Sequence, residues 1–331
     1  MITNHANISL ALAVWLVQDN YDHITEDNYI SATSMMAPLR HIVLRGRPNL
    51  SGEPTTDPDV TEFIARALGN SLHTSVEAAW KEGHARALKL LGYPDGVIEN
   101  IAINPTDEYV KANPNTIPVY LEQRVFRELG DYKIGGKFDL VTDGVLQDTK
   151  STSTYVWTKG SVARDEQYQL QGSIYRWLDA GRAVPRITAD YIRINFIFTD
   201  WSKAEAKYNP KYPQQRIEHK DVSLLSLADT ERWIREKLLL INRFKSANEK
   251  LIPECTDEEL WRSEPVYKYY SDPGKTTGRS TKNFDNISDA NVFMAERGNK
   301  GVVISIQGEP KRCNYCSVFN SCTQKDKYFS A

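Results

Sequence analysis

The longest helical pattern in the chain begins near residue 57. Apolar residues recur at spacings of three and four from Phe63 to Leu91, which predicts one long amphipathic helix. The pair Asp57-Pro58 supplies an N-cap and a proline for the first turn, and Gly92 follows the last apolar position. We therefore expect a helix that starts at 57–58 and stops before Gly92.

Further helices and β-rich runs alternate along the rest of the chain. The pattern predicts strands at 119–126, 132–141, 145–151 and 187–198, helices at 29–47, 163–178 and 224–244, and loops at 49–56 and 104–118. This order indicates an α/β fold with a mixed central sheet flanked by helices. We expect three parts: an N-terminal helical segment (1–56), a core (57–250) and a C-terminal extension packed on the core (251–331).

Composition narrows the class of protein without identifying it. The chain has 331 residues, a formal charge of -2 and 25% charged residues, which excludes disorder, collagen and coiled coil. The longest apolar run, 8–17, is too short to cross a membrane, and no basic residue precedes it. We expect a soluble, cytoplasmic protein without a membrane partner, in which any basic surface for nucleic acid is local.

Three of the four cysteines form a C-x2-C-x5-C run near the C-terminus. They are Cys313, Cys316 and Cys322, and Cys255 lies upstream. Clustered thiols in a cytoplasmic protein indicate a metal site, and no histidine follows residue 219, so Cys255 is the expected fourth ligand. The spacing suits an iron–sulfur cluster or zinc equally, and unligated thiols are a third reading.

A predicted β-hairpin places two acids opposite each other. Asp143-Gly144 is a two-residue turn signal, and the register that it sets pairs Asp139 with Asp148. Directly opposed carboxylates repel, so a cation should lie between them. Lys150 lies on the same face as Asp148, which leaves room for a divalent metal as well. A surface hairpin with scattered charges is the alternative.

The helix predicted at 163–178 carries polar residues on one face. Gln171 and Tyr175 are four apart, and Tyr168 lies three residues before Gln171. A glutamine and a tyrosine that point inward need polar partners, such as a nucleic-acid backbone or a lysine. An amphipathic helix with a polar edge is the alternative.

Together these residues resemble a RecB-type nuclease of the PD-(D/E)XK superfamily. The cysteine run resembles the iron–sulfur staple of its CRISPR-associated and AddB-like branches, although there the isolated cysteine usually precedes the nuclease core. The layout is also similar to exonucleases encoded by bacteriophages. The motifs, in chain order, are His73, Glu122, Asp139 in GGKFDLV, Asp148 and Lys150 in QDTK, and Gln171 and Tyr175 in QGSIY.

The resemblance implies a restriction-endonuclease-like core and roles for its residues. His73, Asp139, Asp148 and the carbonyl of Thr149 would hold Mg2+ or Mn2+, and Lys150 would stabilise the attacking hydroxide and the charge at phosphorus. Glu122 would make a water-mediated metal contact or a structural salt bridge. Gln171 and Tyr175 would brace Lys150 or the DNA backbone. It also favours a 4Fe-4S cluster over zinc at the four cysteines. A histidine buried in the core is the alternative reading of His73.

The resemblance implies DNA as the substrate, single-stranded or with free ends. Tyr155, Trp157 and Lys159 alternate just beyond the predicted active strand and are candidates to bind it, as are the basic and aromatic stretches 201–220 and 266–284. We expect a metal-dependent DNA exonuclease for recombination or end processing, phage-encoded or phage-like. Its partner would be a single-strand annealing or other recombination protein. The alternatives are a noncatalytic DNA-binding or assembly subunit and a redox iron–sulfur protein.

Overall fold

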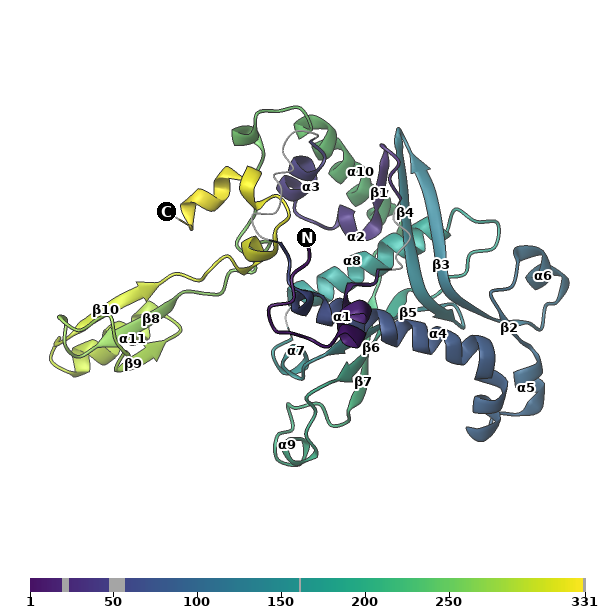
Figure 1. The fold of residues 1–331 in the computed structure, drawn as a ribbon, viewed down its shortest axis with the longest axis horizontal. Coiled ribbons are helices and arrows are strands. Elements are labelled where there is room, and N and C mark those ends of the chain that lie inside the picture. The colour runs from purple at the N-terminus through teal and green to yellow at the C-terminus, as the bar shows by residue number, and fades with distance from the viewer. Residues whose placement is uncertain (20–23, 48–56, 161, 330–331) are drawn as a thin grey trace. The chain divides into compact units, whose positions relative to one another are not determined.

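The structure is a computed structural model that describes residues 1–19, 24–47, 57–160 and 162–329 (Figure 1). Contacts divide these residues into two compact units. The sheet unit comprises residues 1–37 and 57–239, and the cysteine unit comprises residues 38–47 and 240–329. The boundaries at 56/57 and 250/251, expected from the sequence, stay predictions.

A seven-stranded mixed sheet forms the centre of the sheet unit. Its strand order is β2-β3-β4-β5-β6-β7, and β1 pairs with β4. Three pairings are parallel (β1 with β4, β2 with β3, β5 with β6) and three are antiparallel. This architecture confirms the predicted α/β class. The strands are β1 (Tyr29–Ser31), β2 (Ile101–Ile103), β3 (Ile117–Leu129), β4 (Tyr132–Thr142), β5 (Val145–Thr152), β6 (Tyr191–Phe198) and β7 (Ile217–Ser223).

Helix α8 (Val162–Asp179) packs against β3, β4, β6 and β7. Two glycines permit this close approach. A Cβ on Gly172 would lie 2.7 Å from Leu224 and 3.0 Å from Ile192, and one on Gly136 would lie 2.5 Å from the ring of Tyr175. The core between helix and sheet is formed by fully buried apolar side chains, among them Ile134, Phe138, Leu146, Ile174, Trp177, Leu178, Ile192, Ile194 and Phe198.

The long helix lies where the sequence predicts it, but it starts slightly later. A 3-10 turn, η1 (Val60–Phe63), leads into α4 (Ile64–Leu90). Asp59 and Glu62 form a capping box at this start, so the predicted start at 57–58 is wrong by two residues. The remaining helices of the sheet unit are α1 (Leu10–Val17), α2 (Ala32–Met35), α5 (Asp95–Glu99), α6 (Asp107–Ala112), α7 (Tyr155–Thr158) and α9 (Lys203–Tyr208).

The single helix predicted at 29–47 is wrong. Tyr29–Ser31 is strand β1, Ser31 caps α2, and Pro38 precedes a separate helix, α3 (Leu39–Arg45). The loop predicted at 104–118 contains α6, whose first turn is capped by Thr106. The loop predicted at 49–56 lies outside the described residues.

The cysteine unit combines short 3-10 turns with a small antiparallel sheet. Its strands follow the order β10-β8-β9 (Figure 1). Phe293 of α11 packs edge-on against Tyr269 of β8. Helix α10 (Leu227–Phe244), close to the helix predicted at 224–244, contains the boundary between the two units. The other elements are α3, η2 (Glu249–Leu251), β8 (Val266–Tyr270), β9 (Lys282–Phe284), α11 (Ile287–Glu296), β10 (Val302–Ile306), η3 (Lys311–Tyr315), η4 (Phe319–Ser321) and η5 (Thr323–Lys327).

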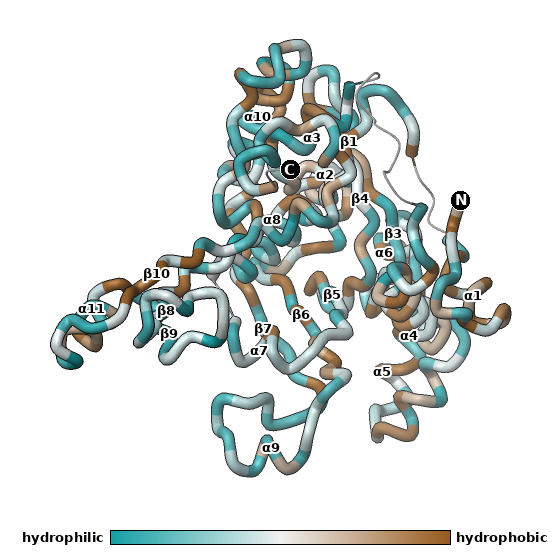
Figure 2. Tube along the Cα trace, turned by 60° about the vertical axis from the view of Figure 1, so that its left-hand side comes forward, coloured by the Kyte–Doolittle hydropathy of each residue, from teal (hydrophilic) through white to brown (hydrophobic). Residues whose placement is uncertain are grey.

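Helix α1 is apolar throughout, as its brown colour in Figure 2 shows. Leu16 is buried against η1 and α4, whereas Leu10 is 79% exposed. None of the helices in the described part of the chain has both the length and the apolarity of a membrane span.

Candidate metal and nuclease site

The register of β3 and β4 brings two acids to one position of the sheet. Leu121 pairs with Leu140 and Gln123 pairs with Phe138, so Glu122 lies opposite Asp139. Glu122 has a φ of 50°, a left-handed conformation that non-glycine residues rarely adopt. Such strain often marks a functional position, because the surrounding structure must stabilise it.

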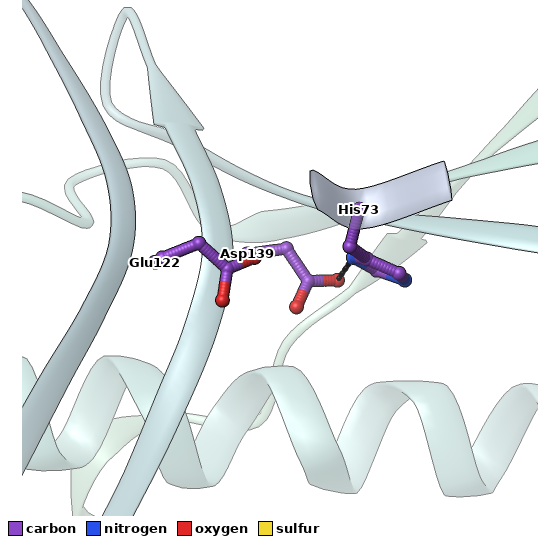
Figure 3. Close-up of side chains that lie close together, drawn as sticks. All are labelled: His73, Glu122 and Asp139. Atoms are coloured by element: carbon purple, nitrogen blue, oxygen red, sulfur yellow. Dashed lines mark ion pairs between the residues drawn. The ribbon is translucent and has the colours of Figure 1, made fainter. Parts of the chain in front are cut away.

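Helix α4 adds a histidine to these two acids. One ligand atom each from His73, Glu122 and Asp139 lie within 4.8 Å of one another (Figure 3). The Nδ1 atom of His73 is 3.2 Å from Oδ2 of Asp139. One imidazole and two carboxylates form a donor set that suits a divalent cation such as Mn2+ or Mg2+. The group lines a cavity of about 690 Å³, whose wall also includes Lys137 and, from α1, Trp15.

The second acid and its lysine lie on β5. Asp148 is 7% exposed, and its Oδ1 accepts a hydrogen bond of 2.9 Å from the Nζ atom of Lys150. The Oδ2 atom is 2.8 Å from the same Nζ but has no hydrogen bond of good geometry within the described residues. The ammonium of Lys150 compensates the charge of this oxygen without a directed hydrogen bond, so Oδ2 keeps lone pairs that suit a metal ion.

The hairpin between β4 and β5 follows the predicted register only near its turn. Asp143 and Gly144 have φ values of 52° and 74°, as a type I′ turn requires. The ladder ends at Leu140 and Gln147. Beyond that point β5 continues along β6 while β4 continues along β3, so the predicted cross-strand pair of Asp139 with Asp148 is wrong.

Asp139 and Asp148 nevertheless influence each other electrostatically. Burial, followed by the negative charges of Asp148 and Glu122, raises the pKa of Asp139 to about 8. Burial acts to lower the pKa of Lys150, but the charge of Asp148 and its hydrogen bond prevail, and the pKa of Lys150 is raised. The lysine therefore stays cationic beside the acids.

The polar face of α8 reaches the same region. Gln171 and Tyr175 line a narrow cavity together with Asp139 and Asp148. The hydroxyl of Tyr175 donates a hydrogen bond of 3.1 Å to the carbonyl of Lys137. This contact holds the backbone of β4 two residues before Asp139. The expected bracing of Lys150 or the DNA backbone by Gln171 and Tyr175 stays a prediction.

The other predicted site residues are spread over β5 and α7. Thr149 lies on β5 between Asp148 and Lys150, and its carbonyl as a metal ligand stays a prediction. Tyr155 and Trp157 belong to the helical turn α7 directly after β5, and their expected contact with DNA stays a prediction. Trp157 packs edge-on against Phe196 and Phe198, whereas Tyr155 is 66% exposed and Lys159 is also exposed.

All four cysteines line one cavity of the cysteine unit. Burial raises the pKa of Cys255 to about 12, so a thiolate there needs a cation. No three of the sulfurs in the described chain lie within 4.8 Å of one another. Four thiolates around one zinc ion, with Zn–S bonds of about 2.3 Å, would be about 3.8 Å apart. The sulfurs therefore converge with a wider spacing than zinc would give.

Two buried polar residues, Arg40 and Gln324, support the cysteines, and no pattern in the sequence marks either. Arg40 is 3% exposed and donates to Sγ of Cys322 at 3.1 Å, and its guanidinium also pairs with Glu249. The amide of Gln324 accepts from the backbone N–H of Cys255 at 2.8 Å and donates to its carbonyl at 2.9 Å. These contacts fix Cys255 and Cys322 beside a buried positive charge, which suits thiolate ligands.

The comparisons with known proteins agree with this geometry. Residues 52–323 match the PD-(D/E)XK nuclease superfamily, and the chain belongs to that superfamily, whose members are metal-dependent nucleases. No curated protein matches the sequence.

Two solved structures are similar to the chain. One is SSO0001, with a TM-score of 0.36 and 18% identity over 67% of this chain and 80% of that one. The other is called a "Putative exonuclease" from Eubacterium rectale, with a TM-score of 0.30 and 14% identity over 68% of this chain and 87% of that one.

Proposed function

We propose that the protein is a DNA exonuclease that hydrolyses phosphodiester bonds with Mg2+ or Mn2+. The observation that supports this proposal most directly is that His73, Glu122 and Asp139 converge on one cavity in a member of a nuclease superfamily. Asp148 would complete the ligand set through its buried Oδ2 atom. A metal ion bound there would polarise the scissile phosphate and lower the pKa of a bound water.

The residues around this group have separate roles in the proposed reaction. Lys150, held cationic by Asp148, would stabilise the negative charge that develops at phosphorus. Gln171 and Tyr175 would hold α8 against the acid-bearing strands. Tyr155 and Lys159 would contact the DNA beyond the site, since both are exposed on the segment that follows β5. The resemblance to phage exonucleases favours a role in recombination or end processing, with a recombination protein as partner.

End-labelled linear DNA, single-stranded and double-stranded, tests this proposal in Mg2+ or Mn2+. We expect stepwise shortening from the ends, no cleavage in EDTA and no cleavage of circular single-stranded DNA. Asp148→Asn, nearly identical in shape, is the matched control and should be inactive. Absence of cleavage by the wild type, or equal cleavage by the control, would refute the nuclease activity. Cutting of the circle would refute exonuclease action alone.

We infer that the four cysteines hold a 4Fe-4S cluster rather than zinc. Their shared cavity and the C-x2-C-x5-C run with one upstream cysteine support this inference. Its role would be structural, since the acids and Lys150 supply the chemistry. Protein isolated without oxygen should be brown and contain iron and sulfide in equal amounts. Colourless protein with one zinc per chain would contradict the cluster and leave the nuclease proposal intact.

A further inference from the structure

One lysine in the metal cavity has no role in the reaction described above. Lys137 lies on β4 two residues before Asp139, so the two side chains leave the strand on the same face. Its Nζ atom is 2.5 Å from Oε2 of Glu122. Both residues line the cavity with His73 and Asp139, and the Lys137 side chain is 33% exposed.

A metal ion and Lys137 compete for the same carboxylate. Glu122 supplies one of the three clustered ligand atoms, yet it is also the ion-pair partner of Lys137. A divalent cation bound to Glu122 would repel a neighbouring ammonium and withdraw its counter-charge. Metal binding should therefore release Lys137 from Glu122.

Lys150 is in a different position. Its partner Asp148 is almost fully buried, so the loss of Lys150 would leave a buried carboxylate without a cation. Lys137 can leave at lower cost, because the metal takes over its partner. A lysine side chain has four flexible carbons, so the released ammonium can reach into the cavity.

We propose that Lys137 is a substrate-binding residue that exchanges Glu122 for a backbone phosphate of the DNA when the metal binds. This inference rests on the proposed nuclease function. Before metal and DNA arrive, Lys137 neutralises Glu122. Afterwards Glu122 faces the metal and Lys137 faces the phosphate, so that each charge has a new partner. Metal and DNA should then favour each other's binding.

The sign of the change in metal affinity distinguishes this role from a structural one. Without DNA, Lys137→Met should bind Mn2+ several-fold more tightly than the wild type in calorimetry, because the competing ammonium is gone. Its affinity for single-stranded DNA in Ca2+, measured by anisotropy, should fall about tenfold, and the slope of log K against log salt should lessen by about one. Lys137→Arg should restore most of the DNA affinity.

Lys133→Met is the matched control, because Lys133 lies on the same strand but pairs with Glu26 outside the cavity. It should change neither affinity. Weaker Mn2+ binding by Lys137→Met, or unchanged DNA affinity, would overturn the inference and show that Lys137 only holds Glu122 in place. Lys137→Gln repeats the test if the methionine variant does not fold. If the wild type cleaves DNA but Lys137→Met does not behave as expected, only this inference is refuted. If the wild type binds no Mn2+, the proposed function is refuted as well.

Discussion

Replacing Gly136 by alanine should disturb the packing that supports the acid-bearing strand. Gly136 immediately precedes Lys137 on β4, and the ring of Tyr175 lies over it. A Cβ at this position would be 2.5 Å from Cε1 of Tyr175, 3.2 Å from its Cδ1 and 3.3 Å from Cβ of Ala32. Tyr175 is 7% exposed and has little space into which to move. The alanine therefore has to displace either the tyrosine or the strand.

The cost follows from two contributions. An added methyl group in a packed core costs about 1–3 kcal/mol. Displacing Tyr175 also breaks its hydrogen bond to the Lys137 carbonyl, which is worth about 0.5–1.5 kcal/mol. We expect Gly136→Ala to lower the free energy of unfolding by roughly 2–4 kcal/mol, or Tm by roughly 5–15 °C for a unit of this size. Tyr175→Phe, which keeps the ring, should cost only about 1 kcal/mol.

A double-mutant cycle tests the stated cause. In a Tyr175→Leu background the ring is absent, so Gly136→Ala should cost at least about 1 kcal/mol less than in the wild type. Thermal melts give the overall change, and deuterium uptake by peptides from β4 and α8 shows where the structure loosens. An equal cost in both backgrounds, or no cost in either, would refute the reasoning.

Substitutions elsewhere should separate chemistry from stability. Asp148→Asn and Lys150→Ala should each abolish cleavage while DNA affinity in Ca2+ persists, and near-normal cleavage by either would contradict the assigned roles. Lys150→Ala should also lower Tm, because it leaves the buried Asp148 without its cation. Arg40→Met should destabilise the cysteine unit by about 1.5–3 kcal/mol in melts, because the partly buried Glu249 carboxylate loses its cation and keeps only the hydrogen bonds from Thr323. Cys316→Ser should give heat-labile protein without iron. A shared cluster closes the loop between Cys255 and Cys313, and a crosslink of that kind contributes on the order of 4 kcal/mol. Hydrogen bonds to the Asp59 carboxylate, first the one that the backbone N–H of His5 donates and then those from Thr61, hold the pKa of Asp59 below its ordinary value. The stability it contributes is present above about pH 4 and is lost as the pH falls through the lowered pKa, so Asp59→Asn should flatten the fall of Tm between about pH 4 and pH 2.

Local signals in the sequence predicted local structure well. The Asp143-Gly144 turn set the hairpin register correctly from Thr142 to Leu140, because a two-residue turn fixes its nearest neighbours. The extension of that register to Asp139 was wrong because β5 leaves β4 to pair with β6, which begins at residue 191. A pattern read along one hairpin contains no information about that distant strand.

Other features that the sequence did not reveal also depend on distant contacts. Tyr29–Ser31 was expected to be helical but pairs with β4 at residues 133–135, about a hundred positions away. Arg40 stands in a basic stretch that is typical of an exposed helix, and its burial depends on Glu249 and Cys322, more than 200 positions away. The left-handed backbone of Glu122 likewise has no local signal such as glycine or asparagine.

Charge balance explains why three acids can share this part of the sheet. Glu122 pairs with Lys137, Asp148 pairs with Lys150, and Asp139 contacts His73 and has a raised pKa. Each carboxylate therefore has its own compensation before any metal binds. It follows that a single acid-to-amide change leaves one cation without its partner, so the effect of such a variant combines a lost ligand with an uncompensated charge. Replacing Glu122 and Lys137 together, and comparing the double variant with each single one, separates these two effects.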